Sequence, residues 1–308
     1  MHLLDTVGAA KLPVTFVSGE GALLWDQGGR TTWDFYGGHA VTLLGQGHPK
    51  WVAAIAEQAR TLSFVTGICD VPVRDRAAER LTRFTGMDRV FFVNSGAEAN
   101  EAALKIARKA TGRPVIVAME HGFHGRTMGA VGVTWHYREQ HAPAHGDVRF
   151  VPFGDLEALR RALGPDVAAV IVEPVQGMAG VVVPPPGWLA SVQRACHEAG
   201  ALLICDEVQC GMGRMGVPLA SHRSGVRPDL ATVGKGVGGG FPVAALLLTE
   251  ELARTCKPGE HGTTFGGGPM AMAAVEATLT IMEEERLLEK AAALGARMHE
   301  LLAVPGVV

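Results

Sequence analysis

The stretch Ala201-Leu-Leu-Ile-Cys-Asp-Glu-Val-Gln209 places Asp206 at the end of an uninterrupted apolar run. Twenty-nine positions later (235 − 206), Lys235 lies in the glycine-rich run Thr232-Val-Gly-Lys-Gly-Val-Gly-Gly-Gly240. A lysine between small residues is free to form and release an imine with a carbonyl compound. An aspartate at the end of a buried strand can hold a cation in a low-dielectric environment. Together these side chains are the protein half of pyridoxal phosphate chemistry.

Short apolar runs without polar alternation predict strands that are covered on both faces. They occupy residues 89–93, 115–118, 167–172, 201–205 and 242–248. Helical patterns are found at about 96–110, 156–163, 188–200 and 270–303, the last with an acidic break at 283–285. Residues 1–45 differ, because they contain short strand patterns at 14–17, 22–25 and 31–35. The alternation in the rest of the chain predicts an α/β fold with a mostly parallel sheet.

Composition narrows the class of protein. Of the 308 residues, 47% are apolar and 19% charged, and the formal net charge is −3. The length suffices for one large domain and a smaller piece, and the interspersed charges form no basic stripe for nucleic acid. The five cysteines include no Cys-x-x-Cys pair, and their odd number argues against a disulfide framework. The sequence shows neither a secretory signal pattern nor a run near the ~20 apolar residues of a membrane helix, so we expect a cytoplasmic protein.

The segment Asn94-Ser-Gly-Ala-Glu-Ala-Asn-Glu101 follows the predicted strand 89–93. Ser95 and Glu98 have the spacing of a capping box, and Gly96 permits a close approach to the backbone. The free N–H groups at the start of this helix and the helix dipole predict a phosphate-binding site. A plain capped helix has the same pattern, so the neighbouring motifs decide between the two.

Two further loops follow predicted strands or lie between them. In His121-Gly-Phe-His-Gly-Arg-Thr127, Phe123 can stack on a flat ring and Arg126 can grip a carboxylate with two hydrogen bonds; a surface loop with a solvated arginine is the alternative. The two histidines of this loop have no spacing that suggests a metal. Glu173, at the end of the predicted strand 167–172, either orients neighbouring polar groups or marks a simple turn.

Asp206 is the stronger signal, because a buried carboxylate can pair with a protonated pyridine nitrogen, while Gln209 can reach a phenolic oxygen on the same ring. An Asp-Glu pair also occurs at magnesium sites of nucleotide hydrolases, but the phosphate loop that such enzymes need is missing. The glycines after Lys235 lack the strand-loop-helix placement of a dinucleotide site. The run His261-Gly-Thr-Thr-Phe-Gly-Gly-Gly268 can complete a phosphate site or form an ordinary loop.

In this order, the segments resemble the class III pyridoxal-phosphate-dependent aminotransferases, and within them the acetylornithine/ornithine branch, from about residue 13 onward. The resemblance implies fold type I, with a mostly parallel seven-stranded sheet, helices on both of its faces and an incomplete small α+β domain. Residues 1–45 would belong to the small domain and 46–275 to the large cofactor domain. Residues 276–308 would form an interdomain helix and the start of the small domain.

The resemblance also implies a role for each matching residue. Lys235 forms the imine with pyridoxal phosphate and moves a proton, and Asp206 pairs with the ring nitrogen. The implied cofactor contacts are Ser95, Gly96, Ala97, Phe123, Glu173, Val208 and Gln209, with Thr264 contributed across the interface of a homodimer. Substrate contacts are implied for Arg126, Thr263 and His39, and no metal is expected.

The implied reaction moves an ω-amino group of an N-acylated or free diamino acid, such as N-acetylornithine, to 2-oxoglutarate by a ping-pong mechanism, as in arginine biosynthesis. Other donors of class III enzymes (ornithine, 4-aminobutyrate, LysW-bound lysine) and decarboxylating or mutase relatives of the same fold remain open. Three departures bear on the choice. Met178 replaces a family glutamate, His39 replaces a tyrosine or apolar residue, and the chain is shorter than family members. We therefore expect a truncated product without the second carboxylate-binding arginine, whose activity is low or absent.

Overall fold

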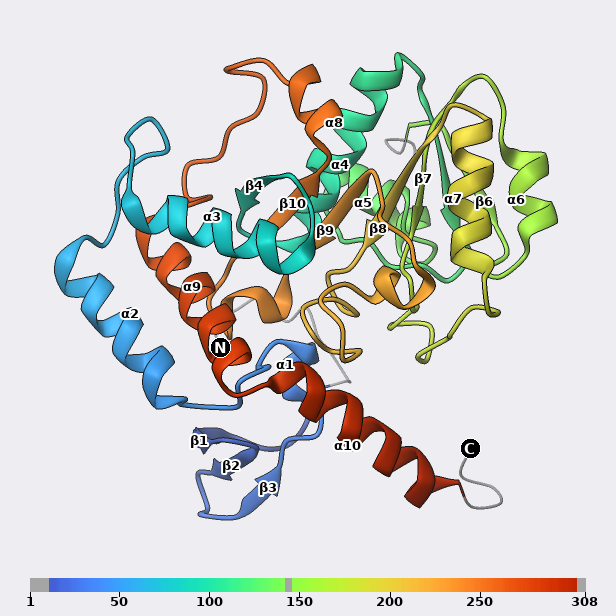
Figure 1. The fold of residues 1–308 in the computed structure, drawn as a ribbon. Helices are drawn as coiled ribbons and strands as arrows, with labels where there is room; N and C mark the ends of the chain where they lie inside the picture. The colour runs from blue at the N-terminus through green and yellow to red at the C-terminus, as the bar shows by residue number, and fades with distance from the viewer. Residues whose placement is uncertain (1–10, 142–145, 304–308) are drawn as a thin grey trace.

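The structure, a computed structural model, describes residues 11–141 and 146–303. It contains a large body built around a central sheet and a small antiparallel sheet near the N-terminus (Figure 1). Among the described residues, none of the helices is both long enough and apolar enough to cross a membrane.

The central sheet has seven strands in the order β4-β10-β9-β8-β7-β5-β6. Every neighbouring pair is parallel except the two pairs made by β10, which is antiparallel to both β4 and β9. The prediction of a mostly parallel seven-stranded sheet is therefore confirmed. The strands are β4 (Arg89–Val93), β5 (Val115–Met119), β6 (Val148–Val151), β7 (Val167–Val172), β8 (Leu202–Asp206), β9 (Leu230–Val233) and β10 (Ala244–Leu248).

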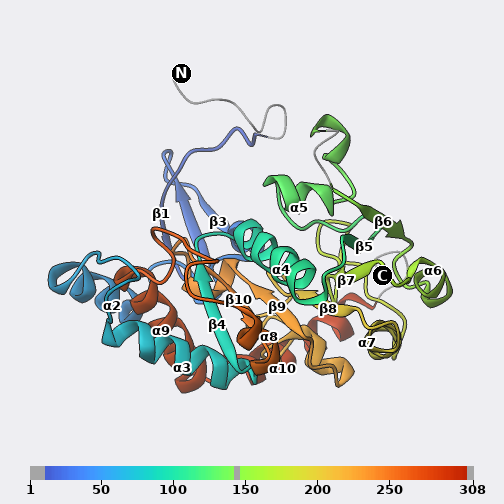
Figure 2. The same ribbon diagram turned by 90° about the horizontal axis from the view of Figure 1, so that it is seen from above.

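Helices cover both faces of this sheet (Figure 2). One face packs against α4 (Gly96–Thr111), whose Leu104 and Ile106 share a buried cluster with Ile116 and Ile171. The other face packs against α6 (Leu156–Ala162) and α7 (Trp188–Glu198) at one end, and against α3 (Pro72–Thr85) and α9 (Pro269–Glu284) at the other. The shorter or peripheral helices are α2 (Pro49–Thr61), α5 (Met128–Gly132), α8 (Glu250–Thr255), η2 (Arg138–His141), η3 (Ala220–Ser224) and η4 (Lys235–Gly238).

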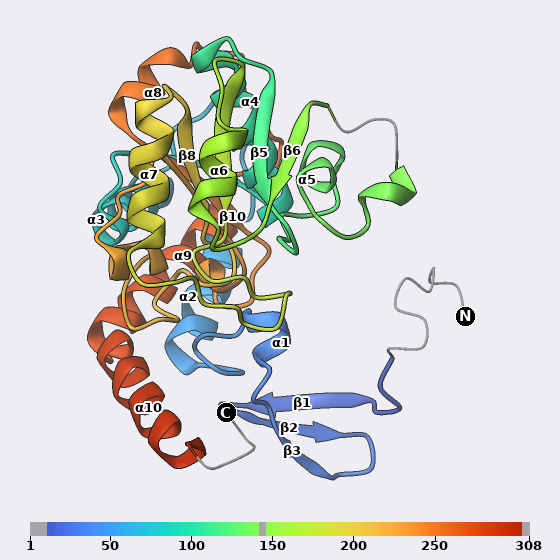
Figure 3. The same cartoon turned by 90° about the vertical axis from the view of Figure 1, so that its right-hand side faces the viewer.

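The helical pattern at 270–303 forms two helices rather than one. Helix α9 ends at Glu284, Arg286 adopts a left-handed conformation (φ 54°), and α10 runs over Leu287–Leu302. The break falls at the acidic residues that the sequence marked. Beyond its first turns α10 extends away from the large body, and its Leu294, Met298 and Leu301 are exposed (Figure 3).

The small sheet consists of β1 (Phe16–Glu20), β2 (Leu23–Asp26) and β3 (Thr31–Trp33), joined as antiparallel neighbours (Figure 3). These strands lie within one to three residues of the predicted ones. After β3 the chain turns through α1 (Gly37–Ala40), where all four residues have positive φ, and returns to the large body. There Leu43 packs so closely on Gly236 that a side chain at position 236 would collide with it. The N-terminal segment thus ends beside Lys235.

Candidate active site

Four segments that are distant in sequence meet at the carboxyl end of the central sheet. A Cβ atom on Gly96 would lie 2.7 Å from Cγ1 of Val208, and one on Gly234 would lie 3.5 Å from Cα of Gly96. A Cβ atom on Gly125 would lie 2.6 Å from that of Ala97. A side chain at position 96 or 125 would collide with its neighbour, and Gly234 lies in contact with Gly96, so the start of α4, the 121–127 loop, the loop after β8 and the loop after β9 form one site.

Asp206 is the last residue of β8 and is almost completely buried, with 3% of its surface exposed. Its Oδ2 lies 2.7 Å from Nδ2 of Asn100 and 2.8 Å from Nδ1 of His124. Its Oδ1 accepts the backbone N–H of Val208 (3.0 Å) and lies 3.3 Å from the Thr232 hydroxyl. A carboxylate only accepts, so His124 carries its proton on Nδ1. This ring of donors fixes the position of the carboxylate.

Lys235 follows β9, and because Asp206 pairs with Thr232 across the parallel strands β8 and β9, the two residues lie at the same edge of the sheet. Lys235 has a positive φ of 46°, a strained conformation of the kind that collects at functional sites. Burial lowers the pKa of its amine, whereas the nearby charges of Asp206 and Glu173 raise it. The lowered pKa increases the fraction of neutral amine, which is the form that attacks carbonyl carbons.

Glu173 lies directly after β7 and orders the 121–127 loop. Its Oε1 accepts the backbone N–H of Phe123 (2.9 Å) and its Oε2 accepts that of Gly177 (3.2 Å). Burial raises the pKa of this carboxyl, and the neighbouring His124 opposes that effect. The Phe123 ring is partly buried and meets the Tyr137 ring edge to face, at 6.2 Å between centroids.

The first turn of α4 carries donors that no helical acceptor satisfies. The Ser95 hydroxyl accepts the N–H of Glu98 (3.3 Å), and the Glu98 carboxylate turns back to the N–H of Asn94 (2.8 Å). Position in the helix leaves the N–H groups of Gly96 and Ala97 without intrahelical partners. They can bind a phosphate at the helix N-terminus.

The remaining predicted residues lie around this centre. Gln209 packs against Gly177, and the Thr263 hydroxyl accepts a hydrogen bond from Nδ2 of Asn94 (3.2 Å). Thr264 is exposed, as is Arg126, whose guanidinium lies over the Tyr137 ring at 4.3 Å. His39 is exposed as well, with its ring 4.6 Å from that of Tyr36. The structure gives no contact that joins these outer residues directly to Lys235.

Sequence reasoning missed three residues that hold Asp206, namely His124, Asn100 and Thr232. His124 was tested only as a metal ligand, although it is buried beside the carboxylate. Asn100 binds Asp206, the carbonyl of His124 (2.7 Å) and, through Oδ1, the Thr232 hydroxyl (2.8 Å). Asn100 faces the sheet from the second turn of α4. Because a buried amide needs hydrogen-bond partners, its position on the buried face of the predicted helix was the signal that could have revealed its role.

Comparison with known proteins places this geometry in a family. The family model described as aminotransferase class III matches residues 6–304. The chain belongs to the class III aminotransferases.

Curated relatives support the same assignment for this class III aminotransferase. It is 45% identical to the acetylornithine aminotransferase of Methanopyrus kandleri over 298 residues, covering 96% of this chain and 77% of that one. It is 47% identical to the acetylornithine aminotransferase of Streptomyces coelicolor over 294 residues, covering 93% and 72%. Among solved structures, the ornithine aminotransferase of Toxoplasma gondii ME49 superposes with a TM-score of 0.92 at 34% identity, covering 97% of this chain and 74% of that one.

Family membership makes the protein a transaminase and pyridoxal phosphate its cofactor. The residues present fit that cofactor. They combine a partly buried amine of lowered pKa, a buried carboxylate ringed by donors, and helix N–H groups without partners. These are the groups needed for an aldehyde, a ring nitrogen and a phosphate, respectively. Among the described residues no cluster of three or more His, Cys, Asp or Glu side chains could hold a metal.

Proposed function

We propose that this class III aminotransferase transfers the ω-amino group of N-acetylornithine, or of a closely similar acylated diamino acid, to 2-oxoglutarate. Its support on the donor side is the identity of 43–47% to curated acetylornithine aminotransferases. On the chemical side, the observation that carries it is the pairing of Lys235 with the buried Asp206 at one edge of the sheet. Ornithine is the second candidate donor, because ornithine aminotransferases are among the most similar folds.

The chain's own residues divide the work in this proposal. When bound, pyridoxal phosphate supplies a carbonyl carbon that amines attack and a ring that withdraws electrons from the bonds of the attached carbon. Lys235, neutral over a wider pH range than an exposed lysine, anchors that carbon and afterwards accepts and returns the substrate proton. Asp206, buried among hydrogen-bond donors, would pair with the ring nitrogen and so favour its protonated form. Phe123 and Val208 would lie against the cofactor ring, and Val208 also packs on Gly96.

Binding of the phosphate falls to the N–H groups of Gly96 and Ala97, the Ser95 hydroxyl and, in our proposal, Thr264 from a second copy in a homodimer. Thr264 fits this role because it is exposed beside Phe265, which is 64% exposed. Gln209 is assigned to the phenolic oxygen and Glu173 to holding the 121–127 loop. Arg126, Thr263 and His39 are assigned to the substrate.

Two broader predictions stay with this proposal. The division into residues 1–45, 46–275 and 276–308 is supported by the separate small sheet and by the helix break near Glu285. A reducing cytoplasmic compartment is supported by the five cysteines, all of which are free thiols in the structure.

A donor panel tests the proposed function. The purified chain is loaded with pyridoxal phosphate and mixed with 2-oxoglutarate and either N-acetylornithine, ornithine, lysine or 4-aminobutyrate, and the glutamate formed is measured. N-acetylornithine is expected to give the highest kcat/KM. Lys235→Ala should abolish both turnover and the visible absorbance of the bound cofactor, whereas Lys105→Ala, an exposed lysine on α4, should leave both unchanged. A folded dimer without a Lys235-dependent absorbance would refute the proposal. Consumption of the donor without formation of glutamate would indicate a decarboxylase or mutase.

A further inference from the structure

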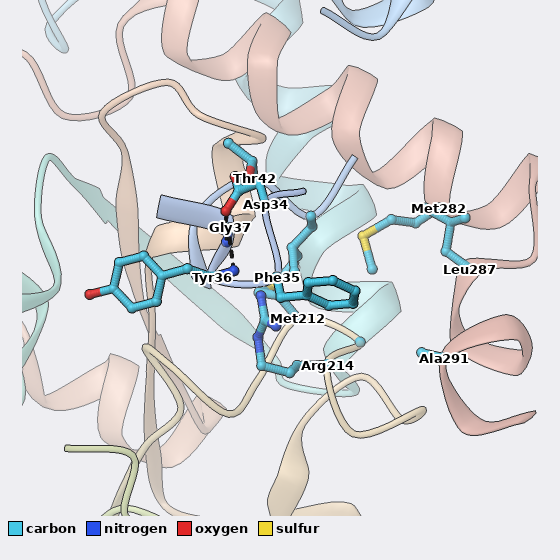
Figure 4. A pocket seen from close by; sticks show the side chains of 12 residues that line it. Asp34, Phe35, Tyr36, Gly37, Thr42, Met212, Arg214, Met282, Leu287 and Ala291 are labelled. Atoms are coloured by element: carbon cyan, nitrogen blue, oxygen red, sulfur yellow. Dashed lines mark hydrogen bonds between the residues drawn. The ribbon is translucent and has the colours of Figure 1, made fainter. Parts of the chain in front are cut away.

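A cavity of about 280 Å³ lies beside the site described above (Figure 4). Three parts of the chain line it: the segment between β3 and Leu43, the loop 212–214 after β8, and the junction of α9 with α10. Met212, Met282 and Leu287 give it apolar walls, and Figure 4 shows Met282 and Leu287 opposite the side that carries Tyr36 and Arg214. The cavity therefore combines apolar side chains with polar groups that could orient a small molecule.

Arg214 is the one Lys or Arg side chain among the described residues that line this cavity. Its guanidinium makes one hydrogen bond, from Nη2 to the carbonyl of Ala40 at 3.1 Å, and within the described residues no carboxylate lies at ion-pair distance. Although the side chain reaches the surface, burial lowers the pKa of the guanidinium and no neighbouring anion compensates. Four of its five N–H donors are therefore available to a ligand.

The carboxylate in the same lining is already engaged. Asp34 accepts the backbone N–H groups of Tyr36 (3.1 Å) and Gly37 (2.7 Å) through Oδ1, which shapes the turn into α1. Asp34 therefore orders the wall of the cavity, and among the described residues no ion pair joins it to Arg214. The free N–H donors of Arg214 remain available to a ligand, although Asp34 contributes a negative charge to the same lining.

Arg214 also acts on the catalytic amine. It lies eight positions after Asp206 (214 − 206), and its charge lowers the pKa of Lys235. Two like charges at one site cost energy, and an anion between or beside them removes that cost. The hydrogen bond to Ala40 places the guanidinium next to His39, in the segment assigned to substrate contacts. A ligand held here would reach toward Lys235.

We propose that this cavity is a carboxylate-binding subsite in which Arg214 grips one carboxylate of the amino acid or 2-oxo acid substrate. The inference rests on the proposed aminotransferase function for the identity of the ligand. Arg126, on a different loop and stacked on Tyr137, supplies a separate guanidinium. The two guanidiniums could then hold the two ends of a 2-oxo dicarboxylate acceptor.

Equilibrium binding of glutarate tests this subsite without requiring turnover. The pyridoxal-phosphate-loaded chain is titrated with glutarate by calorimetry, for the wild type and for Arg214→Gln. A charge-assisted pair is lost in the variant, so its Kd should rise at least about tenfold. Arg223→Gln is the matched control, because Arg223 is also on the surface near this loop and donates to a single carbonyl, that of Met215 (3.1 Å). Its Kd should stay within about twofold of wild type.

The outcomes separate the subsite from the proposed function. Equal glutarate affinity in wild type and Arg214→Gln, or no glutarate binding to the wild type, overturns the subsite. The Lys235-dependent cofactor absorbance, recorded on the same samples, tests the proposed function independently, and either result can fail alone. If Arg214→Gln does not fold by circular dichroism, Arg214→Lys takes its place. That variant keeps the charge but loses the planar fork, and a Kd unchanged from wild type would again overturn the subsite.

Discussion

Replacing Asn100 with alanine removes the central member of the network under Asp206. Asn100 is 1% exposed and makes two bonds to neutral partners, the His124 carbonyl and the Thr232 hydroxyl, and one to the Asp206 carboxylate. Neutral bonds contribute about 1 kcal/mol each and a bond to a charged group about 1.5–3, so the loss should total roughly 3.5–5 kcal/mol. At about 2.1 cal/mol/K of unfolding entropy per residue, Tm should fall by roughly 5–8 °C.

The assay is thermal unfolding of the cofactor-free chain by circular dichroism, followed by titration with pyridoxal phosphate. Thr85→Val is the control, because it deletes one buried hydroxyl bonded to the Leu81 carbonyl (2.7 Å) far from the site. It should lower Tm by only about 1–2 °C and leave cofactor affinity unchanged. If Asn100→Ala lowered Tm no more than this control, the network would not be holding the site and the reasoning would fail.

Three further outcomes are expected. Burial lowers the pKa of Lys235 below its ordinary value of 10.5, so the buried charge destabilises the folded state at neutral pH, and this effect disappears as the pH rises to 10.5. Cofactor-free Lys235→Met should therefore unfold at a higher urea concentration than wild type near neutral pH and at the same concentration near pH 10.5. Urea midpoints that differ by the same amount at every pH would contradict this. Gly236→Val places a side chain against Leu43 and should lower the free energy of unfolding by about 1–3 kcal/mol. An unchanged urea midpoint would show that Leu43 moves aside without loss of stability. Arg74→Met removes hydrogen bonds to two loop carbonyls, including that of Gly267 (2.8 Å), so limited proteolysis should cut the 262–268 loop faster in this variant than in wild type or in the control Arg76→Met. Equal cleavage rates would show that Arg74 does not hold this loop.

Much of the sheet could be predicted because its strands are buried on both faces. The runs at 115–118 and 167–172 contain only apolar residues, and every residue of β5 and β7 is buried. Strand β6 was missed because it lies at the sheet edge with Arg149 exposed, and β9 because it has only four residues. The direction of β10 was available in the sequence, since the ten residues between Val233 and Ala244 are too few for a parallel crossover, which takes about a dozen or more.

The candidate site was predictable only where one segment carries its own chemistry. Lys235 among glycines and Asp206 after an apolar run are local signals. His124 and Asn100 act through Asp206, which lies 82 and 106 positions away, and no local pattern encodes that meeting. Arg214 could not be predicted for the same reason, because its role depends on a cavity that is formed by three separate parts of the chain.

Strand β10 sits between β4 and β9, although it is the last of the seven to leave the ribosome. Until residue 248 has emerged, the strand that precedes Ser95 has no neighbour in the sheet. From residue 96 to residue 248 is 152 positions (248 − 96), or roughly 8–30 s at typical synthesis rates. During that interval the nascent chain carries an apolar strand edge that is prone to pair with another chain.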